Sequence, residues 1–416
     1  MITFEEAQAL MREQVKPGRI RRQPLLESLG LALARPVRAR ADSPRFDVSA
    51  VDGYAVSLSD FSSDLPVTLP ILDVVHAGAS VGAGRAPRKH LKPGSTHRIL
   101  TGAAVPKGTD AIVMQEEITA SGEMVTFQSA PRLGVSIRKQ GGEFRRGERL
   151  FAQGTVITPS VAQSLAACGY AQVPVYARPT VSIITTGDEL RTPGSRLHYG
   201  EIWDSNRIAL EAAMRALGIT NIRIQHVRDN PASTARATSA ALERSDIVIT
   251  TGGVSVGDRD YVKEALHQSG AREIFWRVRI KPGKPLYFAI KRQKAKVKYI
   301  FGLPGNPVAA MVTYQLFVRP AMLRMMGHVE RDASESGVLT VPLKKSDPRT
   351  EFVRARREWA SDARSGIPMI VPLDARGSHM TTGMALADCL LVFPADQEFL
   401  AAGSNVEIIP LRWAAY

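Results

Sequence analysis

The feature that most constrains the fold is a regular alternation of apolar strands and helices that begins after Pro179. The strand-like segments are residues 181–185, 221–227 and 246–250. The helical patterns lie between and after them, at residues 205–217, 231–243 and 261–268. Uninterrupted apolar strands between helices are typical of a parallel sheet that is buried on both faces. We therefore expect a doubly wound α/β domain over residues 179–328.

The regions on either side of this domain have a different texture. A capping-box pattern that starts at Thr3 predicts an N-terminal helix. Residues 46–147 consist of short β-prone runs between Gly, Pro and Ser, which predicts a β-rich domain inserted into a helical domain made of residues 1–45 and 148–178. Short strands return over residues 329–416, where we expect a small β-barrel or sandwich. The predicted fold class is multidomain, α/β plus β.

The positive charge of the chain is concentrated in one place. The chain has 416 residues and a formal net charge of +14, from 54 Lys and Arg against 40 Asp and Glu. Residues 274–329, the acid-free stretch, contain no Asp or Glu and eleven Lys or Arg, so the other residues together carry only 14 minus 11, or +3. The chain also has no RNP, helix-turn-helix or zinc-finger signature. We expect no nucleic-acid partner, and an anion bound near the acid-free stretch.

The sequence also bears on compartment and metal class. Two cysteines, Cys168 and Cys389, cannot form a disulfide framework, which fits a reducing cytoplasm. The N-terminus carries acidic residues where a signal peptide needs basic ones, and no apolar run approaches the ~18 residues of a membrane span. We expect a cytoplasmic protein without membrane contact. The eight His form no HExxH or HxH pattern, which argues against a His/Cys transition-metal site.

Two segments of the α/β domain resemble one another. Residues 183–189 and 248–253 both run from an apolar strand into a Thr-Thr-Gly turn. Ligands of open α/β sheets bind outside the carboxyl ends of the strands, so both turns should border one site. The candidate residues of the two turns are Thr186, Gly187, Asp188, Thr251, Gly252 and Gly253. The second turn continues through Ser255, Asp258 and Asp260 and suits a phosphate, although a Gly-rich connection with an Asp helix cap is the simpler alternative.

A third candidate turn follows the predicted strand at residues 297–301 and reads Gly302-Leu303-Pro304-Gly305-Asn306-Pro307. Asn306 is expected as a helix N-cap and Pro307 as the first helical residue. The N-terminus of the predicted helix at residues 308–322 would then offer free N–H donors to an anion. The alternative is a tight β-to-α turn that binds nothing.

The acid-free stretch holds two basic motifs. One is the loop Lys281-Pro282-Gly283-Lys284-Pro285, where two prolines stiffen the chain and two ammonium groups are held close together. A bound anion best explains the cost of that repulsion. The other motif straddles a predicted hairpin turn and comprises Lys291, Arg292, Lys294, Lys296 and Lys298. We interpret this second motif as a solvated hairpin of unassigned purpose.

Several carboxylates follow predicted strands of the same sheet: Asp188, Glu189, Asp229, Asp258 and Asp260. Each alone is more simply a helix cap or a surface acid. As a set beside phosphate-binding turns they favour Mg²⁺ and substrate positioning, because Mg²⁺ takes carboxylate and phosphate oxygens. In the β-rich domain, the segments around Asp52 and Thr101 look over-specified for turns, but physical arguments alone do not make them a site.

Seven motifs occur in an order known from one family. They are Ser49-Ala50-Val51-Asp52-Gly53-Tyr54-Ala55, Thr101-Gly102-Ala103, Thr186-Gly187-Asp188-Glu189-Leu190, Asp204-Ser205-Asn206, Thr251-Gly252-Gly253-Val254-Ser255-Val256-Gly257-Asp258, Lys281-Pro282-Gly283-Lys284-Pro285 and Gly302-Leu303-Pro304-Gly305-Asn306-Pro307. With these motifs the chain resembles the molybdopterin molybdenumtransferases, bacterial molybdenum-insertion proteins related to the E domain of gephyrin. The resemblance runs from about residue 3 to residue 412.

The resemblance implies a fold, an assembly and a reaction. The fold is a helical domain with an inserted β-rich domain, a molybdopterin-binding α/β domain and a C-terminal β-barrel. The assembly is an elongated homodimer whose active site is shared between subunits, and contact with molybdopterin adenylyltransferase is also expected. The reaction is the Mg²⁺-dependent insertion of molybdate into adenylylated molybdopterin, with release of AMP, in molybdenum cofactor biosynthesis.

The resemblance also assigns residues. It makes Glu189, Asp229 and Asp260 active-site acids, with Glu189 and Asp260 as the metal ligands. Asp52 and Thr101 would be presented by the partner subunit. The molybdate site would comprise Lys281, Lys284, Pro285, Arg354 and Ser378. Further substrate contacts would come from Ser205, Asn206, Pro304, Gly305 and Asn306.

Three positions depart from the family pattern. Phe144 stands where an acid is usual, Ala309 where many members have Ser, and Asp388 where Asn is common. These departures leave open a non-catalytic or altered molybdopterin-binding scaffold paralogue. The rival enzyme, a molybdopterin adenylyltransferase, would resemble the α/β domain alone, so the additional β domains argue against it.

Overall fold

The computed structural model describes residues 1–61, 65–78, 90–253, 261–293, 296–329, 334–359, 366–374 and 377–414. The chain divides into two compact units. The first unit comprises Met1–Arg35, Gln153–Pro159 and Gln172–Tyr416, and the second comprises Pro36–Ala152 and Ser160–Ala171. None of the helices in the described ranges combines the length and the apolar character that a membrane span needs.

The first unit contains the sheet that the alternation of strands and helices predicted. Its six strands lie in the order β16 (Ile222–Val227), β13 (Val181–Thr186), β17 (Ile247–Thr251), β21 (Lys296–Leu303), β20 (Tyr287–Gln293) and β18 (Arg272–Trp276). The first four strands pair in parallel, whereas β20 is antiparallel to both of its neighbours. The carboxyl ends of the four parallel strands therefore share one edge, which is where such sheets bind ligands.

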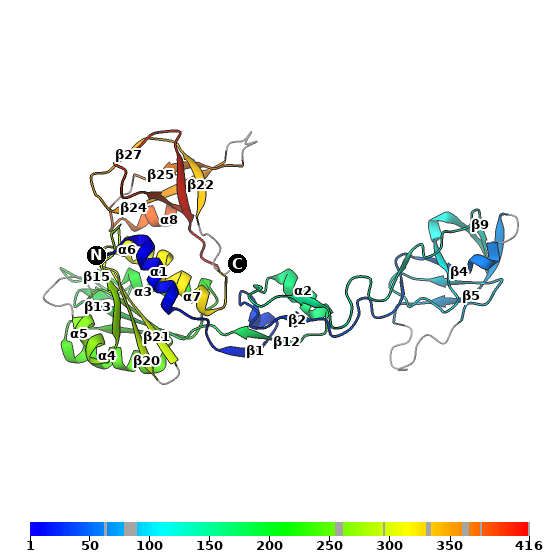
Figure 1. Cartoon of the computed structure of the whole chain (residues 1–416), viewed down its shortest axis with the longest axis horizontal. Coiled ribbons are helices and arrows are strands. Elements are labelled where there is room, and N and C mark those ends of the chain that lie inside the picture. The colour runs from blue at the N-terminus through cyan, green and yellow to red at the C-terminus, as the bar shows by residue number, and fades with distance from the viewer. Residues whose placement is uncertain are drawn as a thin grey trace. The chain divides into compact units, whose positions relative to one another are not determined.

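Helices cover both faces of this sheet (Figure 1). On one face lie α1 (Phe4–Gln14), α3 (Ser205–Ala216), α6 (Pro307–Thr313) and α7 (Arg319–Met325), and on the other lie α4 (Pro231–Arg244) and α5 (Tyr261–Gln268). Successive strand residues alternate between the two cores, with Ile183 in the first and Ile184 in the second. This double burial explains the uninterrupted apolar strands. Thr3 and Glu6 cap α1 reciprocally, as the capping-box pattern predicted.

The long apolar helix expected after Asn306 is interrupted. It consists of α6, a π-helical turn at Tyr314–Val318 and α7. Asn306 occupies the N-cap position and Pro307 the first helical position, but the Asn306 side chain makes no capping hydrogen bond. The predicted N-cap position and the first helical residue are therefore confirmed, although no side-chain bond caps the helix. Every residue of the π-helical turn is buried, so the apolar pattern carried no signal for it.

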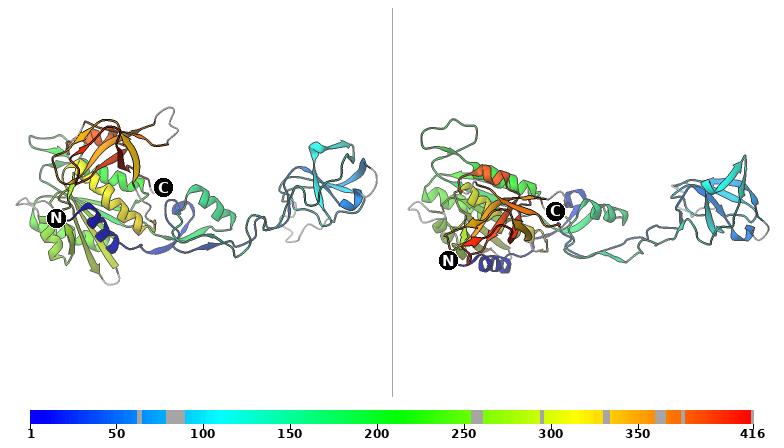
Figure 2. Two further views of the ribbon diagram at one scale, coloured as in Figure 1. Left: turned by 45° about the horizontal axis from the view of Figure 1, so that its top comes forward. Right: turned by 90° about the horizontal axis from the view of Figure 1, so that it is seen from above.

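The C-terminal strands close into a five-stranded barrel, which Figure 2 shows in two further orientations. The ring runs through β24 (Thr350–Glu358), β25 (Met369–Pro372), β22 (Glu335–Leu339), β28 (Asn405–Pro410) and β26 (Cys389–Phe393), and β26 pairs back with β24. The choice between barrel and sandwich is thus settled as a barrel. A short strand of the α/β region, β19 (Ile280–Lys281), adds to β24 in parallel.

Smaller elements complete the first unit. They are β1 (Ile20–Pro24) paired with β12 (Gln172–Tyr176), β14 (Leu190–Arg191) with β15 (Ile202–Trp203), β23 (Leu343–Lys344) with β27 (Phe399–Leu400), the 3-10 turn η1 (Leu26–Ser28) and the helix α8 (Thr381–Leu386). Helix α8 packs near α6 and β24, between the sheet and the barrel.

The second unit is rich in β structure, as the sequence of residues 46–147 predicted. Its main sheet has the order β7 (Ala111–Met114), β4 (Gly53–Val56), β6 (Thr96–Ile99), β5 (Val67–Val75), β9 (Met124–Phe127) and β8 (Ile118–Ser121). Two short ribbons accompany it, β3 (Val48–Ser49) with β10 (Ile137–Arg138) and β2 (Val37–Arg38) with β11 (Arg149–Phe151). The remaining elements are most of α2 (Pro159–Ala167) and the 3-10 turns η2 (Leu58–Phe61) and η3 (Gln115–Glu117).

The basic hairpin differs from its predicted description. Strands β20 and β21 extend beyond the predicted strand ends, so that Gln293 pairs with Lys296. Lys298 is only 5% exposed, and its Nζ donates a hydrogen bond to the Ser245 carbonyl oxygen at 2.7 Å. Burial lowers the pKa of Lys298. The interpretation as a solvated hairpin is therefore wrong for Lys298, although Arg292 and Lys296 are exposed. Lys294 lies outside the described residues.

Candidate functional site

The two Thr-Thr-Gly turns meet at the carboxyl edge of the sheet. They follow β13 and β17, which are parallel neighbours with Thr185 opposite Thr251. Gly252 has a φ of 84°, and a Cβ added there would lie 2.8 Å from Thr186 Oγ1. Glycine is thus required by the positive φ and by the close approach of the other turn. The expectation that both turns border one place is confirmed.

The third turn joins the same edge through Asn206. The Nδ2 of Asn206 donates hydrogen bonds to Thr251 Oγ1 at 2.8 Å and to the Gly305 carbonyl oxygen at 2.7 Å. Thr251 Oγ1 in turn donates to the Pro304 carbonyl oxygen at 3.4 Å. One buried amide therefore connects the start of α3, the turn after β17 and the turn after β21. Ser205, the first residue of α3, is exposed beside it.

The carboxylates of this edge lie after β13 and β16. The backbone N–H of Asp229 donates to Asp188 Oδ1 at 3.3 Å, which brings the ends of the two strands together. The Glu189 carboxylate lies over Gly187, because a Cβ added to Gly187 would lie 2.7 Å from both Glu189 oxygens. Asp188 and Glu189 are both exposed. Three expected members of the site, Ser255, Asp258 and Asp260, lie outside the described residues.

These carboxylates have the chemistry that Mg²⁺ requires. Asp188 and Glu189 are hard oxygen donors at one turn, and Mg²⁺ usually takes one or two carboxylates together with substrate phosphates. In the ranges that the structure describes, no three His, Cys, Asp or Glu side chains form a group that would hold a metal by themselves. The donor set of Asp188 and Glu189 therefore fits a cation that is shared with a bound phosphate.

A basic pocket borders the third turn, between the α/β region and the barrel. Its volume is about 410 Å³. The residues that line it are Lys281, Pro282, Gly283, Lys284, Pro285, Pro304, Asn306, Ala309, Arg349, Glu351, Phe352, Val353, Arg354, Leu373, Gly377 and Ser378. Four of them are Lys or Arg and one is Glu, so the wall carries a net positive charge. The pocket brings together all five residues that the resemblance assigned to molybdate.

Arg354 is the most buried charge in the basic pocket. It is 4% exposed and lies on β24, and its guanidinium donates to the carbonyl oxygens of Met380 at 2.8 Å and Gly377 at 3.1 Å. Burial lowers the pKa of Arg354. Within the described part of the chain no carboxylate forms an ion pair with it. A buried guanidinium that is fixed by neutral carbonyls keeps its full charge for an anion in the pocket.

The loop from Lys281 to Pro285 forms one wall of the basic pocket. Gly283 has a φ of 118°, and a Cβ there would lie 2.6 Å from Thr313 Cγ2, so the loop packs tightly against α6. Lys281 forms an ion pair with Glu351, with 3.3 Å between Nζ and Oε2. The expectation of two unpaired ammonium groups that repel each other is therefore wrong, because Lys281 has a carboxylate partner. Lys284 is exposed and has no such partner among the described residues.

Sequence reasoning missed two members of this wall, Arg349 and Glu351. Arg349 binds Asp347, which lowers the pKa of that carboxyl to about 2, and it also donates to the Ile280 carbonyl oxygen at 3.2 Å. Both residues reach the pocket because β24 pairs with β19, with Lys281 opposite Glu351. That pairing joins segments far apart in the sequence, and no local pattern marks it.

Asp52 and Thr101 lie together in the second unit. Asp52 Oδ1 accepts hydrogen bonds from the backbone N and from Oγ1 of Thr101, both at 2.7 Å. The backbone bond, followed by the hydroxyl bond, lowers the pKa of Asp52. Gly53 is required beside them, because a Cβ there would lie 2.1 Å from the Val113 carbonyl oxygen. Asp52 immediately precedes β4 and is an exposed, ionised carboxylate held by Thr101. It belongs to the second unit, whereas the turns described above belong to the first.

The three residues that depart from the family pattern lie in different environments. Phe144 is 6% exposed and packs with Ala39 and Cys168, so it fills a small core in the second unit. Ala309 is buried in α6 and lines the basic pocket. Asp388 Oδ1 accepts a hydrogen bond from the backbone N of Arg357 at 3.0 Å and lies 3.4 Å from Arg357 Nε.

The fold and the site define a class of protein: a doubly wound α/β protein that presents glycine turns, carboxylates and a basic pocket at the carboxyl edge of its sheet. Three family models match the chain. They are "MoeA N-terminal region (domain I and II)" over residues 2–169, "Probable molybdopterin binding domain" over residues 182–324 and "MoeA C-terminal region (domain IV)" over residues 336–411.

Full-length relatives agree with these matches. A molybdopterin molybdenumtransferase of Haemophilus influenzae is 33% identical over 416 residues, with 99% of each chain covered. The Bacillus subtilis molybdopterin molybdenumtransferase is 33% identical, with 95% of this chain and 91% of the relative covered. The crystal structure of a molybdopterin biosynthesis MoeA protein from Pyrococcus horikoshii has a TM-score of 0.79 at 26% identity, with 99% of each chain covered. The chain belongs to the molybdopterin molybdenumtransferase family.

Proposed function

We propose that the protein inserts molybdate into adenylylated molybdopterin and releases AMP, as a step of molybdenum cofactor biosynthesis. Membership of the family supports the reaction class. The single observation that carries the proposal is the basic pocket, where Arg354 is buried without a carboxylate partner among the described residues. Such a pocket suits a small oxyanion and borders the turns that would hold the rest of the substrate.

Molybdate would bind in the basic pocket. Lys281, Lys284 and Arg354 supply positive charge, Ser378 supplies a hydroxyl donor, and Pro285 shapes the wall. Hydrogen bonds between charged donors and an oxyanion are shorter and stronger than neutral ones. The Lys281–Glu351 ion pair limits the net charge of the pocket, which would let the anion leave it for the acceptor sulfurs.

The phosphates of adenylylated molybdopterin would lie along the carboxyl edge of the sheet. Backbone N–H groups and hydroxyls of the three turns suit phosphate oxygens. The proposed contacts are Thr186, Gly187, Asp188, Ser205, Asn206, Thr251, Gly252, Gly253, Ser255, Asp258, Pro304, Gly305 and Asn306. Asn206 holds two of these turns at a fixed spacing, which preorganises the edge for the substrate.

Carboxylates would position water and charge around the scissile phosphate. We assign this role to Glu189, Asp229 and Asp260, together with Asp52 and Thr101 from the β-rich domain of a partner subunit. Bound Mg²⁺, held by Glu189 and Asp260, would neutralise phosphate charge during cleavage. In phosphoryl transfer the protein mainly positions groups and compensates charge. The ionised, rigidly held Asp52 suits that role.

The proposal includes the assembly. Domain limits at residues 1–45 with 148–178, 46–147, 179–328 and 329–416 belong to it, as does a homodimer that brings the β-rich domain of one copy to the turns of the other. Contact with molybdopterin adenylyltransferase and a cytoplasmic location stay predictions.

One observation favours the alternative function, a scaffold that binds molybdopterin without catalysis. Ala309 lines the basic pocket and offers no hydroxyl to an anion there. A scaffold of this kind would bind molybdopterin without transferring molybdenum.

An AMP-release assay tests the proposal. Purified protein is incubated with adenylylated molybdopterin, Mg²⁺ and molybdate, and AMP and active cofactor are measured. We expect both products. Glu189→Gln should lower the turnover about 10²-fold, because it removes a charge that orients water and metal. Binding of the pterin without any AMP would favour the scaffold, and wild-type rates in Glu189→Gln would contradict the assignment of that residue.

A further inference from the structure

One carboxylate stands among the described residues that line the basic pocket, that of Glu351. Glu351 lies on β24 opposite Lys281 on β19, and its Oε2 lies 3.3 Å from Lys281 Nζ. The Glu351 side chain is only 14% exposed. A carboxylate repels any anion that binds in the same pocket, so its presence there needs a physical reason.

The stability of the fold supplies only a small part of that reason. The Lys281 side chain is 43% exposed, and ion pairs with an exposed member contribute little to stability. The pairing of β19 with β24 is a backbone ladder that does not depend on the two side chains. The repulsion that Glu351 exerts on a bound anion is better explained by control of the charge of the pocket.

Four Lys or Arg side chains line the basic pocket, and two of them are compensated. Lys281 is paired with Glu351. Arg349 is paired with Asp347 through a two-point contact, in which Arg349 Nε donates to Asp347 Oδ1 at 2.7 Å. Each of these pairs adds no net charge to the pocket.

The other two cations, Lys284 and Arg354, are uncompensated. Neither forms an ion pair with a carboxylate in the part of the chain that the structure describes, and Arg354 is held by carbonyl oxygens. Molybdate and tungstate are tetrahedral and doubly negative at neutral pH, so two uncompensated cations balance either anion. An excess of charge of either sign in a partly buried pocket costs free energy.

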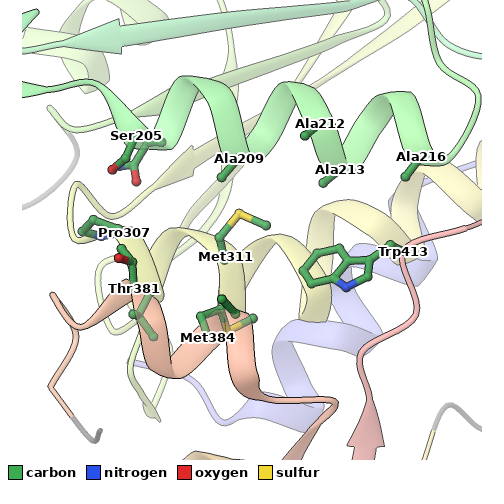
Figure 3. Close-up of a pocket in the computed structure, with 13 residues that line it drawn as sticks. Ser205, Ala209, Ala212, Ala213, Ala216, Pro307, Met311, Thr381, Met384 and Trp413 are labelled. Atoms are coloured by element: carbon green, nitrogen blue, oxygen red, sulfur yellow. The ribbon is translucent and has the colours of Figure 1, made fainter. Parts of the chain in front are cut away.

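Another cavity of the first unit provides a contrast. It also has a volume of about 410 Å³ and lies between α3, α6 and α8 (Figure 3). Its walls are alanines of α3 together with Met311, Met384 and Trp413, and none of its described lining residues is charged. An oxyanion would lose its hydration there without gaining a cation. This cavity therefore gives an oxyanion no competing site.

We propose that Glu351 is a specificity-determining residue, which holds the basic pocket at two uncompensated cations and so matches it to doubly charged tetrahedral oxyanions. This inference rests on the proposed function and widens its substrate class to molybdate and tungstate alike. A singly charged oxyanion leaves one cation unbalanced and binds weakly. A more highly charged group, such as the pyrophosphate link of the other substrate, leaves negative charge unbalanced. Glu351 acts through Lys281 and through the total charge rather than by contact with the reacting atoms.

Tungstate and perrhenate test the inference, because they share a tetrahedral shape and a similar size but carry two negative charges and one. Calorimetry on the full chain measures both affinities, and the readout is their ratio. We expect the wild type to bind tungstate at least about tenfold more tightly than perrhenate. A purely structural role of Glu351 would change both affinities by the same factor.

Glu351→Gln is the decisive variant, because it frees Lys281 and raises the number of uncompensated cations to three. A doubly charged anion gains about twice the free energy of a singly charged one from the added charge. We expect tungstate to bind about tenfold more tightly and perrhenate about threefold, so the ratio rises about threefold. Glu351→Asp keeps the carboxylate and should keep the ratio close to that of the wild type.

Two further variants test the same charge count. Lys281→Ala leaves Glu351 unpaired in the pocket and should lower the ratio below that of the wild type. Lys281→Ala/Glu351→Gln removes both members of the pair and should restore the ratio, because Lys284 and Arg354 again stand alone. This comparison also decides the inference if Glu351→Gln fails to fold, which urea unfolding would reveal.

Glu358→Gln is the matched control. Glu358 lies on the same strand as Glu351 and forms an ion pair of similar length with Arg356, at 3.4 Å, but it does not line the basic pocket. Both affinities should stay at their wild-type values in this variant. A change of ratio in Glu358→Gln as large as in Glu351→Gln would make the effect a property of the whole surface and overturn the inference.

Three other results would also overturn it. They are equal affinity of the wild type for the two anions, an unchanged ratio in Glu351→Gln, and the same ratio in Glu351→Asp as in Glu351→Gln. The outcome is separable from that of the proposed function. A ratio that depends on Glu351 in a protein that releases no AMP retains this inference and rejects the reaction. AMP release by a protein whose ratio ignores Glu351 does the reverse.

Discussion

The acid-free stretch places its positive charges in two regions with opposite surroundings. In the loop from Lys281 to Pro285, the charges line a cavity that is shared with a buried arginine of the barrel. In the hairpin of β20 and β21, exposed Arg292 and Lys296 lie nearer the turn than Lys298, whose ammonium is used inside the protein. Both regions look equally basic in the sequence. The difference lies in whether the charges converge on space that an anion can enter.

This difference shows that charge density alone does not indicate a binding site. Lys298 is buried and its ammonium donates a hydrogen bond to the Ser245 carbonyl oxygen, so this lysine contributes to the packing of the protein rather than to the binding of an anion. Arg354 is equally buried and also donates to carbonyl oxygens, but it lines a cavity, so its charge can act on an anion there. The following predictions test the contrast between the two regions.

The largest effect is expected at Lys281. Lys281→Ala removes a cation from the basic pocket and also leaves Glu351 there without its ion-pair partner. Turnover in the AMP-release assay should fall about 10³-fold, near the upper range for the loss of one oxyanion donor. The double variant Lys281→Ala/Glu351→Gln should recover part of the loss, because the stranded negative charge is gone. A double variant as slow as the single one would show that repulsion by Glu351 is not involved.

Lys284 and Lys296 form a matched pair of exposed lysines, one in each region. Lys284→Ala should lower turnover about 10²-fold and weaken molybdate binding measured by calorimetry. Lys296→Ala should leave both unchanged. Neither substitution should alter the free energy of unfolding by more than about 0.5 kcal/mol, since both side chains are on the surface. Equal losses in the two variants would mean that the acid-free stretch attracts the anion through its total charge rather than through Lys284 in particular.

Lys298 should affect stability but not activity. Lys298→Met keeps the length of the side chain and removes the donor to the Ser245 carbonyl oxygen. The free energy of unfolding should fall by about 1–2 kcal/mol, because a buried acceptor loses its partner. Urea unfolding measures this loss, and the AMP-release rate of the folded variant serves as the control. A slower folded variant would place the hairpin in the site after all.

Asp347 gives the smallest effect, and it depends on pH. Arg349 lowers the pKa of the Asp347 carboxyl to about 2, below its ordinary value of 3.8. A lowered pKa in the folded state stabilises the protein above the unfolded pKa, and this contribution is lost as the pH falls towards about 2. Asp347→Asn should therefore lower the free energy of unfolding by its full amount at about pH 6. The difference from the wild type should become progressively smaller below about pH 4. Urea unfolding across this range checks the trend; a constant difference at all pH values would contradict it.

The turns of the site were predictable because their signals are local. Thr186 and Gly252 follow apolar strands directly, and parallel strands bring such turns to one edge. The buried strands β13 and β17 themselves followed from an uninterrupted apolar pattern, and the structure has them within one residue of the predicted bounds.

The basic pocket was predictable only in part. Physical reasoning singled out Lys281 and Lys284, but Arg354 and Ser378 came from the family resemblance alone. Arg349 and Glu351 were missed because they face the pocket only through the pairing of β19 with β24. Lys298 was misjudged for the same reason, since its contact with Ser245 spans 53 positions of sequence. Contacts of that range depend on how the strands pack, which a pattern of residue types does not encode.

The pairing of β19 with the barrel limits how the barrel can be exchanged between related proteins. Ile280 pairs with Thr350 and Lys281 with Glu351, so the α/β region and the barrel share one backbone ladder. Side chains alternate along a strand, and a shift of register by one residue would turn Lys281 away from the cavity. A barrel transplanted from a relative would therefore have to preserve that register as well as its own fold. In engineered hybrids of this family, the segment to exchange is therefore the barrel together with the strand β19 that pairs with it, rather than the barrel alone.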